Sequence, residues 1–183
     1  MATQGYALFE TSIGHCGIAW NERGVACLHL PEREAATTRA RLLKRLAADT
    51  EHDTEPGPAT RDAIRAIREL LEGQPHDLQQ IELDMQDVPE FARKVYRASR
   101  LILPGATQTY GELARRIGSP GAARAVGHAL GQNPFAIIVP CHRVLAAGGG
   151  IGGFSARGGV RTKWRMLEIE RAITAGEQLP LGL

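Results

Sequence analysis

The charge of this 183-residue chain changes sign near residue 87, which limits how the chain can be divided into domains. Residues 1–87 carry 9 Lys and Arg against 15 Asp and Glu, a net of −6, whereas residues 88–171 carry 13 against 4, a net of +9. Chance drift is one explanation of this difference. The other is binding to a polyanion such as nucleic acid, which basic residues concentrated in one half favour. We therefore expect an acidic accessory domain over 1–87 and a basic, DNA-binding domain over 88–183.

The acidic half has the pattern of strands followed by helices. Residues 6–30 hold two or three short strands, with NERG (21–24) as a hairpin turn. Residues 32–48 and 59–73 carry apolar side chains at helical spacing, and the second of these segments ends on a glycine. Residues 79–87 alternate between apolar and polar, as a strand does. These patterns predict a small N-terminal α/β domain.

The basic half is predicted to be mainly helical, so that the whole chain is α+β or α/β. Helical patterns cover 88–102, 111–118 and 121–133, and a Ser-Pro break separates the last two. Ser119 is suited to cap the last helix and Pro120 to begin it. Two short helices joined by a turn predict a helix-turn-helix, although any corner between two helices has the same pattern.

The helix over 121–133 carries mostly small residues, and Arg124 is its one long cation. Tight packing on a neighbouring helix explains such a surface. Close approach to DNA explains it too, because a helix about 10–12 Å wide enters a minor groove about 6 Å wide only if the helix is smooth and the groove is widened. The positive charge of this half favours DNA, with Ala123 and Arg124 at the contact.

Cys141 lies between a proline and a histidine, after the apolar run FAIIVP (135–140). That run predicts a buried strand that leads to the PCHRV turn, and strand ends commonly hold reactive side chains. Cys141 is a packing residue, a metal ligand, half of a disulfide or a nucleophile. Because a cysteine reacts as the thiolate, His142 and Glu170 are the groups that would activate it as a nucleophile.

The remaining cysteines give weaker signals. His15, Cys16, Cys27 and His29 lie on the arms of the predicted hairpin, lack the tight spacing of zinc ligands and alternate between faces. We interpret them as ordinary strand residues and expect no metal. Three cysteines make no disulfide framework and fit a reducing compartment. With no signal-peptide pattern and no apolar run long enough for a bilayer, we predict a cytoplasmic protein without a membrane partner.

Five motifs in order along 88–171 resemble one family. They are TYGELA (109–114), AARAVGHAL (122–130), GQNP (131–134), PCHRV (140–144) and GGFSARGG (152–159). Together they resemble the methylated-DNA–protein-cysteine methyltransferases, also called O6-alkylguanine-DNA alkyltransferases. The resemblance implies DNA repair by stoichiometric, irreversible transfer of an alkyl group from O6 of guanine to a cysteine after base flipping, with O4-alkylthymine as a further candidate substrate. It implies a monomer that needs no cofactor and whose partner is double-stranded DNA containing O6-alkylguanine.

The resemblance also implies a role for each catalytic residue. Cys141 resembles the nucleophile, His142 the base that deprotonates it through a water, and Glu170 the carboxylate that orients the imidazole. Asn133 resembles the asparagine that braces the reactive turn. Tyr110 resembles the tyrosine that assists departure of the guanine and rotation of its phosphate.

Further residues are expected at the DNA and around the flipped base. Arg124 resembles the arginine that enters the stack in place of that base, and we expect Arg143 to contact the DNA as well. Ser155 and the backbone around Val144 resemble the walls that read the guanine. Phe154 stands where some members carry tyrosine, so that a contact through that hydroxyl is lost.

Two other departures concern the size of the pocket. Ala136 stands where some relatives carry proline, and GGGIGG (148–153) is richer in glycine than in many of them. Both changes would open the pocket to larger alkyl groups.

Two other functions stay open at this point. One is a DNA-binding module that flags lesions or regulates genes through the same helix-turn-helix and leaves Cys141 unmodified. The other is a cysteine hydrolase that uses Cys141, His142 and Glu170, turns over and needs no DNA.

Overall fold

A three-stranded antiparallel sheet forms the first part of the fold in the computed structural model, which describes residues 5–46 and 55–173. The strands β1 (Gly5–Thr11), β2 (Gly14–Asn21) and β3 (Gly24–His29) are neighbours in chain order. The predicted NERG hairpin is confirmed, since Asn21 pairs with Gly24 across the turn.

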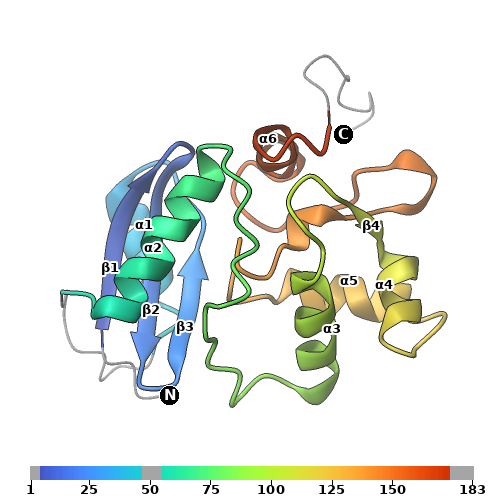
Figure 1. Cartoon of the computed structure of the whole chain (residues 1–183), viewed down its shortest axis with the longest axis horizontal. Coiled ribbons are helices and arrows are strands. Elements are labelled where there is room, and N and C mark those ends of the chain that lie inside the picture. The colour runs from blue at the N-terminus through green and yellow to red at the C-terminus, as the bar shows by residue number, and fades with distance from the viewer. Residues whose placement is uncertain (1–4, 47–54, 174–183) are drawn as a thin grey trace.

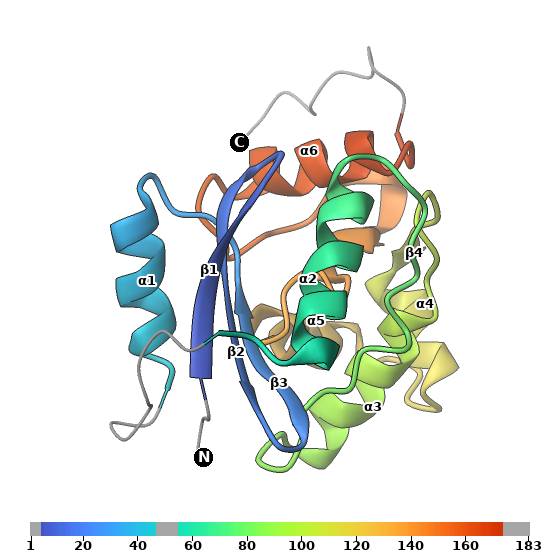
Figure 2. The ribbon, with the colours of Figure 1, turned by 60° about the vertical axis from the view of Figure 1, so that its left-hand side comes forward.

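Two helices cover opposite faces of this sheet. α1 (Ala35–Leu43) lies on one side and α2 (Pro58–Leu71) on the other, as Figure 2 shows. Alternation along β2 sends Ile18 toward α2 and Ala19 toward α1, where Leu42 packs against it. Both predicted helices are confirmed, although α1 is shorter than its pattern and the end of that pattern lies outside the described residues.

Cys16 and Cys27 pack on opposite faces of the sheet, Cys16 toward α2 and Cys27 toward α1. Both are buried, and burial raises the pKa of Cys16 to about 12 and that of Cys27 to about 11. Thiols with such pKa values stay protonated at neutral pH and react poorly. These two cysteines are core residues of the sheet.

The second part of the fold is mainly helical, so the expected mixed α and β architecture is confirmed (Figure 1). Its helices are α3 (Glu90–Arg100), α4 (Tyr110–Arg116), α5 (Ala123–Gly131) and α6 (Val160–Ile169). Two short parallel strands, β4 (Gln108–Thr109) and β5 (Val144–Leu145), and two single turns of 3-10 helix, η1 (Cys141–Arg143) and η2 (Ala147–Gly149), complete it. In residues 5–46 and 55–173, no helix combines the length and apolar composition needed to cross a bilayer.

α4 and α5 pack against each other as the predicted helix-turn-helix pair. α4 begins with a capping box: Thr109 Oγ1 accepts the N–H of Glu112, whose carboxylate accepts the N–H of Thr109 (2.7 Å). The prediction that Ser119 caps α5 and that Pro120 begins it is wrong. A turn intervenes, in which the N–H of Ala122 donates to the Ser119 carbonyl (3.1 Å), and α5 starts after it.

Two segments predicted as strands are not strands. Residues 79–87 contribute a single bridge, between Leu83 and Val25 of β3. Residues 135–140 are largely buried, as predicted, but form a tight turn in which Ile137 has a φ of +70°. Buried turns and buried strands have the same apolar composition, so a short apolar run does not distinguish them.

The outer edge of β3 is paired with backbone from both of these segments. The N–H of Val25 donates to the Glu82 carbonyl (2.9 Å), the N–H of Ala136 donates to the Leu28 carbonyl (3.3 Å), and the N–H of Leu28 donates to the carbonyl of the adjoining Pro134 (2.8 Å). A Cβ on Gly24 would lie 2.4 Å from the Glu82 carbonyl oxygen, so this close approach requires glycine. β3 therefore joins the sheet directly to the apolar turn of the second half.

One hydrophobic core runs through both halves of the chain. It includes Ile18 and Leu28 of the sheet, Ile67 of α2, Val126 of α5 and Met166 of α6. The division of the chain at residue 87 thus stays a prediction from charge, and the core itself is continuous across that point.

A buried carboxylate, Asp84, ties the β2–β3 hairpin to the segment beside it. The Arg23 guanidinium donates to both of its oxygens (2.8 and 3.0 Å), Asn21 Nδ2 donates as well, and these bonds hold the pKa of Asp84 at about 2. Asp84→Ala should lower the free energy of unfolding at pH 7 by about 2 kcal/mol, because charge-assisted hydrogen bonds are lost.

The pKa of Asp84 is depressed, so its contribution is present above the ordinary value of 3.8 and is lost as the pH falls toward 2. The difference between wild type and Asp84→Ala in urea unfolding should shrink over that range. Asp87→Ala, at an exposed neighbour, should change stability by less than about 0.5 kcal/mol. Equal effects of the two substitutions would contradict the role of Asp84.

Candidate active site

Cys141 opens the turn η1 directly after the buried apolar turn. Asn133 holds that turn closed, because its Nδ2 donates to the Val139 carbonyl (3.0 Å) and its Oδ1 accepts the N–H of Phe135 (2.9 Å). The N–H of Cys141 donates to the same Val139 carbonyl (2.8 Å). The left-handed backbone of Ile137 is a conformation that a β-branched residue rarely adopts, so the turn is held by its surroundings.

The Cys141 thiol is half-buried, and burial raises its pKa. Three features act in the other direction: a hydrogen bond from the Asn133 side chain, the charge of Lys163 and the backbone N–H groups of Cys141 and His142. Each of them stabilises the thiolate relative to the thiol. Cys141 is therefore a shielded thiol with donors and a cation around its sulfur.

A buried carboxylate joins the two residues that follow Cys141. His142 Nε2 lies 2.9 Å from Glu170 Oε1, and Arg143 reaches both carboxylate oxygens (Nε to Oε2 and Nη2 to Oε1, each 2.8 Å). These side chains are at most 3% exposed. Since the carboxylate accepts a hydrogen from Nε2, we assign the neutral His142 ring a lone pair on Nδ1. Within the part of the chain that the structure describes, that buried Nδ1 has no hydrogen-bond partner.

Burial and neighbouring charges decide the protonation of this group. Burial lowers the pKa of His142, although the Glu170 carboxylate acts to raise it, so the imidazole is neutral at pH 7. Burial alone would raise the pKa of Glu170, but His142 and Arg143 outweigh burial and hold that pKa at about 2. A neutral imidazole beside an ionised carboxylate is able to take up a proton and to be stabilised as imidazolium.

Arg143 is not a DNA-contacting residue, and the expectation that it contacts DNA is wrong. Its side chain is 2% exposed, and its guanidinium binds Glu170 and the carbonyl of Ile102. The planar fork of an arginine suits this bidentate grip on a buried carboxylate. Its place beside Cys141 in the sequence gave no sign of that burial.

Lys163 is a site residue that sequence reasoning missed. Its side chain is fully buried on α6, its Nζ donates to the Val144 carbonyl (2.6 Å), and the ammonium lies 5.7 Å from the centre of the Tyr110 ring. Burial lowers its pKa to about 8. A signal was present, because Lys163 falls on the apolar stripe of α6 with Met166 and Leu167, where a charged residue is out of place.

A cavity of about 910 Å³ opens on Cys141 between α4, α5 and the glycine-rich segment that follows β5. Several predicted site residues share it. They are Tyr110, Ala123, Arg124, Cys141, Phe154 and Ser155. Arg124 is exposed, whereas burial raises the pKa of Tyr110 and keeps its hydroxyl protonated. A Cβ on Gly152, whose φ is +73°, would lie 3.1 Å from the Tyr110 ring, so glycine lets this segment pack on the tyrosine.

Two predicted pocket residues lie outside this cavity. Val144 is fully buried, and its carbonyl is occupied by the Lys163 hydrogen bond. Ala136 lines a smaller cavity of about 130 Å³, which also reaches Cys141. The departure at Ala136 therefore does not enlarge the main cavity.

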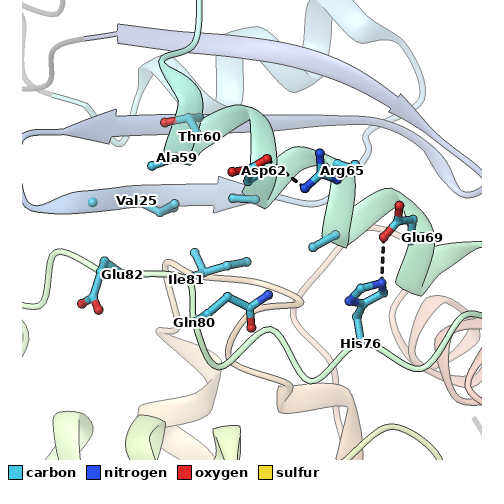
Figure 3. A pocket seen from close by; sticks show the side chains of 13 residues that line it. Val25, Ala59, Thr60, Asp62, Arg65, Glu69, His76, Gln80, Ile81 and Glu82 are labelled. Carbon is cyan, nitrogen blue, oxygen red and sulfur yellow. Dashed lines mark ion pairs between the residues drawn. The ribbon is translucent and has the colours of Figure 1, made fainter.

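A further hollow of about 450 Å³ lies between α2, the start of β3 and residues 76–82 (Figure 3). Two pairs of side chains interact in it, His76 with Glu69 (2.7 Å) and Arg65 with Asp62 (2.9 Å). None of the predicted site residues lines it, so the chemistry of Cys141 is separate from this hollow.

Comparison with known proteins agrees with the resemblance. Residues 90–172 match the family model of the 6-O-methylguanine DNA methyltransferase DNA-binding domain. A methylated-DNA–protein-cysteine methyltransferase of Mycolicibacterium paratuberculosis is 53% identical over 91 residues, which are 50% of this chain and 53% of that protein. The one of Mycobacterium tuberculosis is 38% identical over 146 residues, 79% of this chain and 86% of that protein.

Comparison with solved structures leads to proteins of the same kind. The crystal structure of Mycobacterium tuberculosis OGT in complex with DNA matches with a TM-score of 0.70 and 33% identity, over 92% of this chain and 93% of that one. Identity above 30% over most of both chains, together with the matching fold, means that this chain belongs to the methylated-DNA–protein-cysteine methyltransferase family.

Proposed function

We propose that this chain repairs DNA by moving an alkyl group from O6 of guanine onto Cys141, once per protein molecule, with O4-alkylthymine as a second substrate. The observation that carries the proposal is a half-buried thiol at a 910 Å³ cavity beside the helix-turn-helix, with the buried His142–Glu170 pair behind it. The names of the relatives, and the DNA in one of their structures, support double-stranded DNA as the partner.

The position of the cavity requires the base to leave the helix. An alkyl group on O6 lies within a stacked base pair, out of reach of a thiol held in a cavity, so the nucleotide must rotate out at a cost of a few kcal/mol. α5 has a face of small residues on which DNA could lie closely, and exposed Arg124 at the cavity is suited to fill the gap in the stack.

The transfer itself is a displacement at carbon. His142 Nδ1 takes the thiol proton through an intervening water, Glu170 stabilises the resulting imidazolium, and the thiolate attacks the alkyl carbon in line with O6. The Tyr110 hydroxyl donates a hydrogen bond to the departing guanine. The product is a thioether, which water and thiols do not readily cleave, so Cys141 is consumed.

The same chemistry supports a reducing location for the protein. The structure holds Cys16, Cys27 and Cys141 as free thiols, and Cys141 is useful only while it is reduced. We therefore propose the cytoplasm as the site of action.

The first prediction concerns stoichiometry. A duplex with one O6-methylguanine should raise the mass of the peptide containing Cys141 by one methylene unit, because a methyl group replaces the thiol hydrogen. The yield should stop near one per protein, because the thioether is stable. Mass spectrometry of the intact and digested protein measures both. Cys141→Ser should bind the duplex and transfer nothing. Continued turnover would instead indicate a hydrolase, and binding without transfer by wild type would indicate a lesion-binding module.

The second prediction separates base extrusion from chemistry. Arg124→Ala should slow repair of O6-methylguanine in a duplex by about tenfold or more, because nothing then replaces the extruded base. Reaction with the free base O6-benzylguanine should stay nearly unchanged. Arg124→Lys retains the charge without the planar fork and serves as the control. Equal losses on both substrates would mean that Arg124 belongs to the pocket and not to extrusion.

The third prediction concerns Lys163 as a positioning residue for the thiolate. Lys163→Met should move the pH profile of Cys141 alkylation by iodoacetamide to higher pH, because a nearby cation that favours the thiolate is gone, and should slow the reaction at pH 7 by about tenfold. The difference from wild type should narrow above pH 8, where Lys163 itself loses its charge. Lys163→Arg should restore the profile. An unchanged profile in Lys163→Met would mean that the lysine only supports packing.

A further inference from the structure

The large cavity at Cys141 is lined by two cations and no acid. Among the described residues that line it, the charged ones are Arg115 and Arg124, and none is Asp or Glu. Many of the others are small or apolar, such as Gly127 and Leu130. With Arg124 in the gap of the base stack, Arg115 is the cation that remains at the rim.

The two arginines come from adjacent ends of the helix-turn-helix. Arg115 lies in the last turn of α4 and Arg124 in the first turn of α5, and the two helices pack side by side (Figure 1). Arg115 is exposed. Within residues 5–46 and 55–173, its guanidinium takes part in no hydrogen bond and no ion pair. It is therefore available to an anion that arrives at the cavity.

The acid one turn earlier on α4, Glu112, is engaged elsewhere. Its carboxylate accepts the N–H and the hydroxyl of Thr109 (2.7 and 2.8 Å). These bonds, and to a lesser degree the charge of Arg115, lower the pKa of Glu112. Because Thr109 precedes α4, the carboxylate is directed toward the start of the helix and away from its last turn. The charge of Arg115 at the rim is thus largely uncompensated.

We propose that Arg115 binds a phosphate next to the extruded nucleotide. The inference rests on the proposed function and adds a substrate-binding residue to it. A base that rotates into the cavity stays joined to its sugar and its flanking phosphates, so these phosphates move to the rim with it. A phosphate that leaves the hydrated, counterion-rich surface of the duplex for the edge of an apolar cavity requires a cation, and a guanidinium donates charge-assisted hydrogen bonds to it.

The tasks of the two arginines require different properties. Filling a gap in the stack depends on the planar guanidinium, whereas holding a phosphate depends mainly on positive charge, which lysine also supplies. Arg115→Lys should therefore keep most of the rate of duplex repair, unlike Arg124→Lys.

The test is a cycle of changes in the protein and in the DNA. Single-turnover repair is measured for wild type and Arg115→Gln on O6-methylguanine duplexes in which each phosphate flanking the lesion is, in turn, natural or a neutral methylphosphonate. Arg115→Gln should slow repair of the natural duplex about tenfold, because a charge-assisted hydrogen bond is lost. On the duplex that lacks the charge of the bound phosphate, the same substitution should cost little, because the interaction is already gone.

Arg116→Gln is the matched control. Arg116 is exposed in the same turn of α4, about 100° around the helix from Arg115, and does not line the cavity. Its substitution should change the rates on natural and methylphosphonate duplexes by the same factor. Alkylation of Cys141 by iodoacetamide, which involves no DNA, reports in every variant whether the site is intact.

Several results would overturn the inference. If Arg115→Gln loses the same factor on the natural and on both methylphosphonate duplexes, Arg115 contacts neither flanking phosphate. No loss on any duplex would mean that the arginine takes no part in repair, and an equal loss in Arg115→Lys would mean that its charge is not what matters. Slower alkylation by iodoacetamide in Arg115→Gln would assign its effect to the fold. Failure of wild type to repair O6-methylguanine in the natural duplex would refute the proposed function, which is a separate result.

Discussion

The active site depends on one buried carboxylate, that of Glu170. It binds His142 and Arg143 at once, and Arg143 in turn binds the carbonyl of Ile102. The end of α6, the turn η1 and the end of α3 are thereby held together by charges that are costly to remove from water. Removing one member of such a group strands the others, at a typical cost of about 3–5 kcal/mol. The same buried group of charges therefore fixes the position of the His142 imidazole and stabilises the fold.

The second constraint is the hydrogen bonding of the edge of β3 to the turn before Cys141. Through this edge the acidic half supports the reactive cysteine. The turn before Cys141 is hydrogen-bonded to Leu28, and Asn133 closes the same turn from within. A nucleophile held on a turn needs such bracing, because a turn has no ladder of neighbouring strands to fix its position. The sheet also contributes one wall of the small cavity through Leu28 and Leu30, so its influence extends to the surroundings of the sulfur.

Arg143 and Lys163 are both buried beside Cys141, but their charges are compensated to different degrees. Arg143 is neutralised by a bidentate carboxylate, whereas Lys163 has a carbonyl and the face of Tyr110 as its nearest partners. The low pKa of about 8 expresses how unfavourable that position is for a charge. A residue kept in such a position contributes to reactivity more readily than to stability, and Lys163 is accordingly placed with the thiolate in the proposed mechanism.

Local sequence determined the helices up to residue 133 and the NERG hairpin, because periodicity reports on neighbours along the chain. The group of Cys141, His142 and Glu170 came from the chemistry that a thiol nucleophile needs and from the resemblance to the family's motifs. Local sequence did not determine residues 79–87 and 135–140, whose apolar pattern suits a buried turn as well as a strand, and it misplaced the start of α5. Only the tertiary structure showed that the side chains of Arg143 and Lys163 are buried. Whether a long cationic side chain faces DNA or the core depends on partners far away in sequence, as Glu170 is for Arg143, and only the folded chain brings those partners together.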